Sequence, residues 1–202
     1  MKVASLMIPD PITITEGASI SEAIVIMKES SIRHLPVVTK GNRLTGFVTL
    51  ADMKQGLIPS MVSDVSLADL MIKDPIVIGP DDDIEIAARI IYQHKIGGMP
   101  VVKNNKLVGI ITETDILRAF IDMMGLLTAR SRIDLVIEDK PGLFRQVLQI
   151  ISDNGGDIIN VGMPSQPKSE RVYYFRLAPC NIKVIKKALE QEGFKVVAAL
   201  DS

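Results

Sequence analysis

The stretch Leu6-Met7-Ile8-Pro9-Asp10-Pro11-Ile12-Thr13-Ile14 recurs 64 residues later as Leu70-Met71-Ile72-Lys73-Asp74-Pro75-Ile76-Val77-Ile78. Farther along, Gly46-Phe47-Val48-Thr49-Leu50-Ala51-Asp52 matches Gly109-Ile110-Ile111-Thr112-Glu113-Thr114-Asp115 at an offset of 63, because one loop is a residue shorter in the second copy. Self-similarity at a fixed spacing indicates a duplicated structural unit. We therefore expect two copies of one unit, over residues 1–62 and 63–125.

Each copy has the pattern of a helix, a strand hairpin and a second helix. Apolar residues recur at helical spacing from Ile20 and from Ile84, and the candidate caps are Ser19 or Ser21 and the run Asp81–Asp83. Runs of β-branched residues predict the hairpins Leu35–Val38 with Phe47–Thr49 and Met99–Val102 with Val108–Thr112. So small a unit leaves an apolar face uncovered, so we expect the copies to pack together about a pseudo-twofold axis.

The pattern changes after residue 131. An alternating strand at Ile133–Ile137 precedes a helix from Leu143, two further strands, a helix from Ile182 and a last strand at Phe194–Ala199. Pro164–Ser169 is interpreted as the hairpin loop between the two middle strands, Ile158–Met163 and Val172–Leu177. The order βαββαβ predicts a third domain over residues 131–202.

Composition favours a soluble protein. The net charge is −1 and the charged residues are interleaved, so we expect neither nucleic acid nor a membrane surface as a partner. A single cysteine, Cys180, excludes an intrachain disulfide, and no apolar run approaches the roughly 18 residues of a membrane span. These features predict a cytoplasmic protein.

Three features recur together in both copies: the Asp-Pro-Ile entry, the hydrophobic-Pro-Val-Val strand, and Gly followed by Thr-x-x-Asp. With these features both copies resemble CBS domains, and the pair resembles a Bateman module. The third domain resembles an ACT domain in its Asp139-Lys140-Pro141-Gly142-Leu143 turn and its Gly155-Gly156-Asp157-Ile158 segment. The whole arrangement is similar to the acetoin-utilisation regulatory family (AcuB-like). It implies an α/β (α+β) fold: a CBS pair with pseudo-twofold symmetry, followed by a ferredoxin-like ACT domain.

The Thr-x-x-Asp pairs are the first candidate ligand contacts. Each pair places a hydroxyl and a carboxylate where a strand leads into a helix, beside the positive end of the helix dipole. In CBS modules the Asp accepts hydrogen bonds from ribose hydroxyls and the Thr lies near the phosphate. The resemblance implies these roles for Thr49 with Asp52 and for Thr112 with Asp115. The alternative is that each pair only caps the second helix.

The resemblance also places adenine in an apolar slot between the copies. In this chain the corresponding residues are Thr13, Ile32 to Pro36, Val77, and the stretch Ile96, Gly97, Gly98, Met99 and Pro100. The Ile and Val side chains are equally suited to the core, so the resemblance implies chiefly main-chain contacts.

Arg33 and His34 stand where related modules place cations that bind phosphate, whereas the second copy has Gly97 and Gly98 there. We therefore expect two unequal clefts. The one with Thr49, Asp52, Arg33 and His34 binds a phosphorylated nucleotide, and the glycines leave room for close backbone approach or a bulkier adenosyl ligand. The alternative is that Arg33 and His34 are a solvated pair on a loop, and His94 and Lys95 are interpreted as surface residues.

For the third domain the resemblance implies either an amino-acid site or a dimer interface. The candidate residues are Asp139, Pro141, Gly142, Leu143, Asp157, Ile158 and Asn160. Two carboxylates close to a ligand carboxylate would repel it, which favours dimerisation. Asn160 is otherwise a solvent-facing strand residue.

Catalysis is not expected. The chain has two histidines, one cysteine, no metal-ligand cluster, and no Walker-type or Gly-x-Gly-x-x-Gly phosphate loop. The acidic run Asp81–Asp83 is better explained as helix capping than as a cation site. We therefore expect a non-catalytic regulatory homodimer that binds AMP, ADP, ATP or S-adenosylmethionine, with an unknown partner protein. The alternative is an oligomerisation or partner-binding protein whose clefts stay empty.

Overall fold

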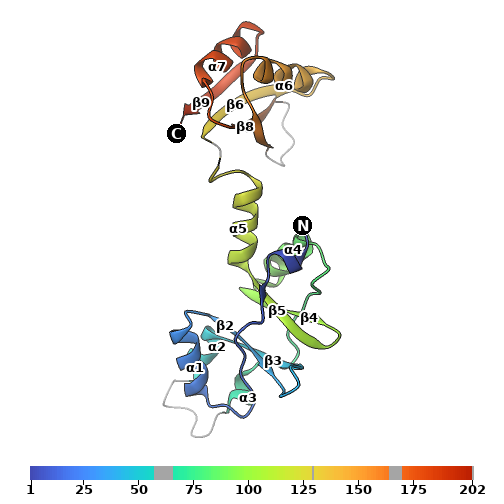
Figure 1. Ribbon diagram of the computed structural model, residues 1–202, viewed down its shortest axis with the longest axis vertical. Helices are drawn as coiled ribbons and strands as arrows, with labels where there is room; N and C mark the ends of the chain where they lie inside the picture. Colours follow the sequence, from blue (N-terminus) through green and yellow to red (C-terminus); the bar gives the residue numbers. More distant parts are fainter. Residues whose placement is uncertain (57–65, 129, 164–169, 202) are drawn as a thin grey trace. The chain divides into compact units, whose positions relative to one another are not determined.

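A computed structural model describes residues 1–56, 66–128, 130–163 and 170–201. It divides into two units, Met1–Leu117 and Arg118–Ser202, with the boundary inside one helix (Figure 1). The first unit holds both copies of the repeat and the second holds the βαββαβ segment. The expected junction between the copies, at residues 62 and 63, and the loop Pro164–Ser169 lie outside the described residues.

The first copy has the predicted order of elements: α1 (Ile20–Glu29), β2 (His34–Val38), β3 (Leu44–Thr49) and α2 (Leu50–Gly56). The N-terminus of α1 is closed by a capping box, in which Ser19 Oγ accepts from the Glu22 N–H at 3.1 Å and Glu22 Oε2 accepts from the Ser19 N–H at 2.7 Å. Of the two serines proposed as caps, Ser19 is therefore confirmed.

The second copy repeats this order after a short helix α3 (Leu67–Leu70), with α4 (Ile84–His94), β4 (Gly98–Lys103), β5 (Lys106–Thr112) and α5 (Glu113–Met123). The prediction that Asp81–Asp83 caps α4 is wrong in detail. Asp83 is the N-cap residue, but its side chain makes no capping hydrogen bond and pairs with Lys2 at 2.8 Å. Asp81 pairs with Lys103 at 3.1 Å. Asp82 Oδ2 accepts from the Gly79 N–H at 2.8 Å. Two of the three carboxylates therefore form surface ion pairs, and the third closes the turn before the helix.

The leading segment of each copy pairs with the hairpin of the other copy. The 3-10 turn η1 (Val3–Ser5) is followed by the short strand β1 (Ile8–Pro9), in which Ile8 pairs with Ile110 of β5. The equivalent residue in the second copy, Ile72, exchanges two backbone hydrogen bonds with Phe47 of β3. Leu67 and Met71 complete the core of the first copy, beside Met27 and Leu35 among others. This exchange makes the two copies one folding unit.

Glycines make the exchange possible. A Cβ on Gly46 would stand 2.5 Å from Met71 Sδ, and one on Gly109 would stand 2.5 Å from Met7 Sδ. The glycine that opens the motif Gly-x-x-Thr is thus explained by the methionine of the opposite copy packing over it.

The second unit is a four-stranded antiparallel sheet with the order β7-β8-β6-β9, formed by β6 (Ser131–Glu138), β7 (Ile158–Gly162), β8 (Glu170–Leu177) and β9 (Lys195–Asp201). Helices α6 (Leu143–Asp153) and α7 (Ile182–Gln191) cover one face (Figure 1). Their core residues, such as Val147 and Ile185, pack against Ile133 and Phe175 of the sheet. The predicted ferredoxin-like βαββαβ arrangement is confirmed.

Within the described part of the chain, no helix is both long and apolar enough to cross a membrane. In the same residues, no group of three His, Cys, Asp or Glu side chains is arranged to hold a metal ion.

Candidate functional site

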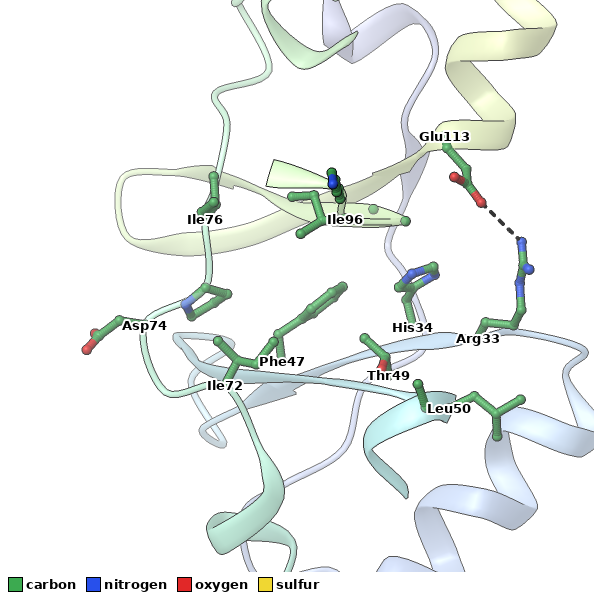
Figure 2. A pocket seen from close by; sticks show the side chains of 15 residues that line it. Arg33, His34, Phe47, Thr49, Leu50, Ile72, Asp74, Ile76, Ile96 and Glu113 are labelled. Carbon is green, nitrogen blue, oxygen red and sulfur yellow. Dashed lines mark ion pairs between the residues drawn. The ribbon is translucent and has the colours of Figure 1, made fainter. Parts of the chain in front are cut away.

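A cavity of about 600 Å³ lies in the first unit, where the two copies meet (Figure 2). The first copy contributes the start and end of its hairpin and the first turn of α2, and the second contributes its leading segment, the end of α4 and the start of α5. The lining residues are Arg33, His34, Phe47, Thr49, Leu50, Ala51, Ile72, Asp74, Pro75, Ile76, Lys95, Ile96, Gly97, Gly98 and Glu113.

One end of the cavity is apolar. Ile72, Ile76 and Ile96 of the second copy face Phe47 of the first (Figure 2). Ile72 and Ile76 are exposed although they are aliphatic. Exposed apolar side chains that surround a concave space are typical of ligand sites, where they flank a flat apolar group.

The other end carries an ion pair. Arg33 Nη2 lies 3.8 Å from Glu113 Oε1, and both side chains are more than half exposed (Figure 2). An exposed pair at this separation contributes about 0–1 kcal/mol to stability, so it opens readily. The Arg33 guanidinium therefore remains available to an anionic group.

His34 lies on the cavity wall and stacks on Phe47, with 5.8 Å between ring centroids. Burial, and secondarily the Arg33 charge, lower the pKa of His34 below its ordinary value. A lowered pKa favours the neutral imidazole. His34 therefore forms part of the cavity wall, and its role as a phosphate-binding cation stays a prediction.

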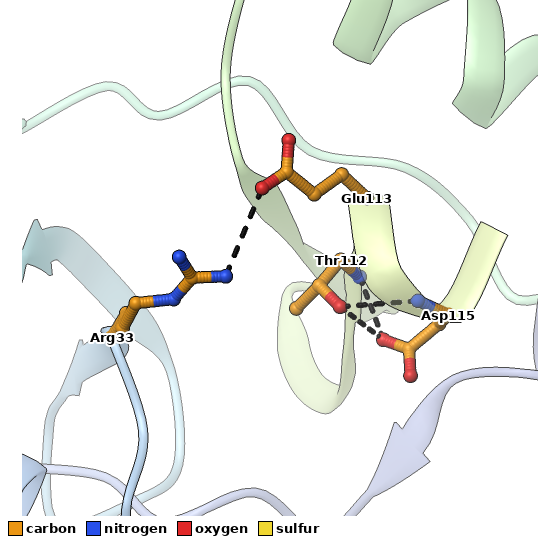
Figure 3. Close-up of polar contacts among 4 residues, drawn as sticks. All are labelled: Arg33, Thr112, Glu113 and Asp115. Atoms are coloured by element: carbon orange, nitrogen blue, oxygen red, sulfur yellow. Dashed lines mark hydrogen bonds and ion pairs between the residues drawn. The ribbon is translucent and has the colours of Figure 1, made fainter. Parts of the chain in front are cut away.

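Both Thr-x-x-Asp pairs cap the helices they begin. Asp52 Oδ2 accepts from Thr49 Oγ1 at 2.7 Å, and Asp115 Oδ2 accepts from Thr112 Oγ1 at 2.6 Å (Figure 3). The backbone N–H of each Thr donates to the same oxygen. All these bonds end on Oδ2, so the Oδ1 atoms take no part in the cap. Both pairs therefore cap their helices, and one oxygen of each carboxylate is left outside the cap. Contact of either pair with a ligand stays a prediction.

The structure brings together six of the residues predicted to contact the nucleotide, all of which line the cavity: Arg33, His34, Thr49, Ile96, Gly97 and Gly98. The cations and the glycines line this one cavity together, whereas the sequence predicts two unequal clefts. Gly97 also lines a second pocket, with Tyr92 and Gln93, so the predicted pair of clefts stays a prediction. The other predicted contacts do not line the cavity that contains Arg33: Thr13, Ile32, Pro36, Asp52, Val77, Met99, Pro100, Thr112 and Asp115.

Several lining residues were missed by the sequence. Lys95, interpreted as a surface residue, ends α4 in a left-handed conformation and lines the cavity. Glu113 was not singled out because its equivalent in the first copy is Leu50, so the repeat gave no signal. Asp74, directly before Pro75, belongs to the Asp-Pro-Ile motif itself, which was used only as evidence for the repeat.

In the second unit the candidate residues have local structural partners. Asp139 pairs with Arg171 at 3.5 Å, and Asn160 Nδ2 donates to the Met123 carbonyl at 3.1 Å. Gly142 precedes α6 with a positive φ of 92°. The expected ligand or interface role of Asp139, Pro141, Gly142, Leu143, Asp157, Ile158 and Asn160 stays a prediction.

The CBS domain family model matches residues 3–58 and 63–122, more than half of the chain. The chain belongs to the CBS domain family. The predicted tandem arrangement is thereby confirmed, and the cavity is a feature of a CBS pair.

Solved CBS pairs match about three fifths of the chain. The pair of protein MJ0100, solved with 5′-methylthioadenosine and S-adenosyl-L-methionine, is 30% identical with a TM-score of 0.56 and covers 59% of this chain and 95% of its own. An acetoin utilization protein (AcuB) from Vibrio cholerae is also 30% identical with a TM-score of 0.56, covering 62% and 94%. CBSX2, solved with AMP, is 27% identical with a TM-score of 0.53, covering 60% and 96%.

Curated relatives are longer proteins. Homoserine O-acetyltransferase from Methanohalobium evestigatum is 38% identical over 117 residues, which are 57% of this chain and 23% of the relative. The chain thus spans about a quarter of the length of the curated relatives it matches first. The similarity lies in the CBS region, and the activity in the relative's name does not transfer with it. The ACT assignment and the AcuB-like membership stay predictions.

Proposed function

We propose that the CBS pair binds an adenosine-type ligand in the cavity and that the chain is a non-catalytic regulatory protein. One observation carries the proposal: one concave space of about 600 Å³ joins an apolar end to an end that carries an arginine. Ligand sites typically have volumes of about 300–1,000 Å³ and a few polar groups on mostly apolar walls.

The lining suggests a role for each part. The isoleucines and Phe47 flank the base, and Thr49 and the free Oδ1 of nearby Asp52 face the ribose hydroxyls. Arg33 contacts the group attached at the 5′ carbon. The adenosine compounds solved in the CBS pairs of MJ0100 and CBSX2 support this class of ligand. The second unit acts as a second sensor or as a dimerisation module in a homodimer.

Thermal unfolding with adenosine, AMP, ADP, ATP, 5′-methylthioadenosine and S-adenosylmethionine tests the proposal. A ligand at 100 times its Kd stabilises the native state by about 2.7 kcal/mol, so the midpoint should rise with concentration. No rise with any of the six compounds would exclude adenosine binding. Ligand carried through purification should be identified by mass spectrometry.

Asp52→Ala, with Asp69→Ala as its control, assigns the ligand to this cavity. Asp69 caps α3 as Asp52 caps α2, with Oδ2 accepting from Ser66 Oγ at 2.6 Å. Neither carboxylate lines the cavity itself, but Asp52 is hydrogen-bonded to Thr49, which does line it, whereas Ser66 does not. Both variants should lose about 0.5–2 kcal/mol of stability. Only Asp52→Ala should also weaken ligand binding, and equal affinity in the two variants would remove Asp52 from the site.

The capping boxes favour one alternative. Because Asp52 and Asp115 already serve their helices, the motif would persist in a pair whose cavity stays empty and whose role is oligomerisation or partner binding. In that case Asp52→Ala loses stability and no adenosine compound shifts the midpoint. Sedimentation of the full chain measures the assembly that this alternative requires.

A further inference from the structure

The cavity is symmetric in its backbone and asymmetric in its charges. The Leu50 N–H donates to the Arg33 carbonyl at 2.9 Å, and the Glu113 N–H donates to the Gly97 carbonyl at 3.0 Å. The repeat makes Arg33 equivalent to Gly97 and Leu50 equivalent to Glu113. All four residues line the cavity. The same backbone hydrogen bond therefore occurs in both copies. The Arg33–Glu113 ion pair has no counterpart, because the equivalent residues are Gly97 and Leu50.

The backbone position of Glu113 is fixed by the start of α5. Glu113 is the first residue of α5 and directly follows Thr112, whose capping box with Asp115 fixes the start of the helix (Figure 3). Its carboxylate points across the cavity mouth to Arg33, at 3.8 Å from Oε1 to Nη2. Any group that approaches Arg33 from the cavity also meets the Glu113 carboxylate.

The charges of the lining cancel. Two cations, Arg33 and Lys95, are matched by two anions, Asp74 and Glu113, and the lowered pKa of His34 keeps its imidazole from adding a positive charge at neutral pH. A phosphate group can replace Glu113 as the partner of Arg33, but the displaced carboxylate remains beside it. Each further phosphate adds repulsion between like charges, and a neutral or zwitterionic group does not.

We infer that Glu113 is a specificity-determining residue of this cavity: it favours an adenosyl ligand with a neutral or zwitterionic 5′ group and disfavours adenine polyphosphates. This inference rests on the proposed adenosine binding and adds the charge of the preferred ligand. It replaces the sequence expectation that Arg33 and His34 together select a phosphorylated nucleotide.

The test is calorimetric titration of the full chain with adenosine, 5′-methylthioadenosine and ATP, in wild type and in Glu113→Gln. Wild type should bind 5′-methylthioadenosine about tenfold more tightly than ATP, and Glu113→Gln should tighten ATP binding by about tenfold while the adenosine affinity stays within about twofold. Glu85→Gln is the matched control, because it removes a carboxylate from the first turn of α4, outside the cavity. Glu85→Gln should leave the affinities for ATP and for adenosine at their wild-type values.

Two outcomes overturn the inference and leave adenosine binding intact. One is a wild-type chain that binds ATP more tightly than 5′-methylthioadenosine, and the other is a Glu113→Gln variant with the wild-type ratio of affinities. If neither form binds any of the three compounds, the proposed function fails and the inference fails with it. Retained adenosine binding in Glu113→Gln shows that the variant is folded.

Discussion

Gly97 lies directly against the imidazole of His34: a Cβ atom at position 97 would stand 2.8 Å from Nε2 and 3.1 Å from Cε1. The same ring stacks on Phe47, so moving it would disturb that contact as well. The two residues come from opposite copies, so their contact joins the copies at the cavity wall. The glycine is required here for space.

Gly97→Ala should therefore destabilise the protein by about 1–3 kcal/mol, the usual cost of overpacking, and should weaken ligand binding by displacing His34. Urea unfolding measures the first effect and calorimetry the second. Gly17→Ala is the control, since a Cβ there would meet nothing within 4 Å, and it should change stability by no more than about 0.5 kcal/mol. Equal effects of the two substitutions would contradict the contact.

Leu67→Ala should destabilise the first unit by about 2–5 kcal/mol, the range for a leucine removed from a core. Leu67 is fully buried and completes the core of the first copy, although it belongs to the second copy in sequence. Leu117→Ala, at a position 59% exposed on α5, is the control and should cost about 0.5 kcal/mol or less. Urea unfolding compares the two, and a small loss for Leu67→Ala would show that the copies do not exchange their leading segments.

Helical and strand periodicity predicted nearly every element of this chain, because each copy buries one face and the buried positions follow the period of the element. The exchange between copies was not predictable in the same way. The repeat shows that Ile8 and Ile72 are equivalent, but it carries no information on whether each pairs with its own hairpin or with the other. The glycine under the methionine does not distinguish the two pairings either, because both hairpins have one, Gly46 and Gly109.

The cavity was predicted in part for a related reason. Arg33 and Thr49 stand in motifs, so they could be recognised, whereas Lys95 and Glu113 have unlike residues at the equivalent positions. For Gly97 the sequence predicts a separate cleft, because equivalent residues in two copies are expected to serve two equivalent sites. A twofold axis that runs through a cavity has the opposite effect and brings equivalent residues to the same space.

His34 should make stability depend on pH below neutrality. Its folded-state pKa lies below the ordinary value of 6.5, so the unfolded chain binds the proton first as the pH falls. Stability is therefore lost as the pH drops through 6.5 toward the folded-state pKa, and above 6.5 the residue contributes no pH dependence. Between pH 5 and 8, the free energy of unfolding in urea should fall less on acidification in His34→Gln than in wild type, as the linkage relation requires. An acid loss of stability in His34→Gln equal to that of wild type would show that His34 does not carry the effect.

Asp134→Asn should destabilise the second unit by about 1–3 kcal/mol. Asp134 is buried on the sheet face opposite the helices and accepts two hydrogen bonds from Arg132, at 2.7 and 2.6 Å. The amide removes the negative charge and leaves the guanidinium, which also lies 5.1 Å from the Tyr174 ring centroid, without its counter-ion. Hydrogen exchange of the β6 amides measures this loss locally. Asp153→Asn, at an exposed side chain that accepts from Gln149, is the control and should leave β6 exchange unchanged. Equal β6 protection in wild type and Asp134→Asn would show that the buried pair contributes nothing to the stability of the sheet.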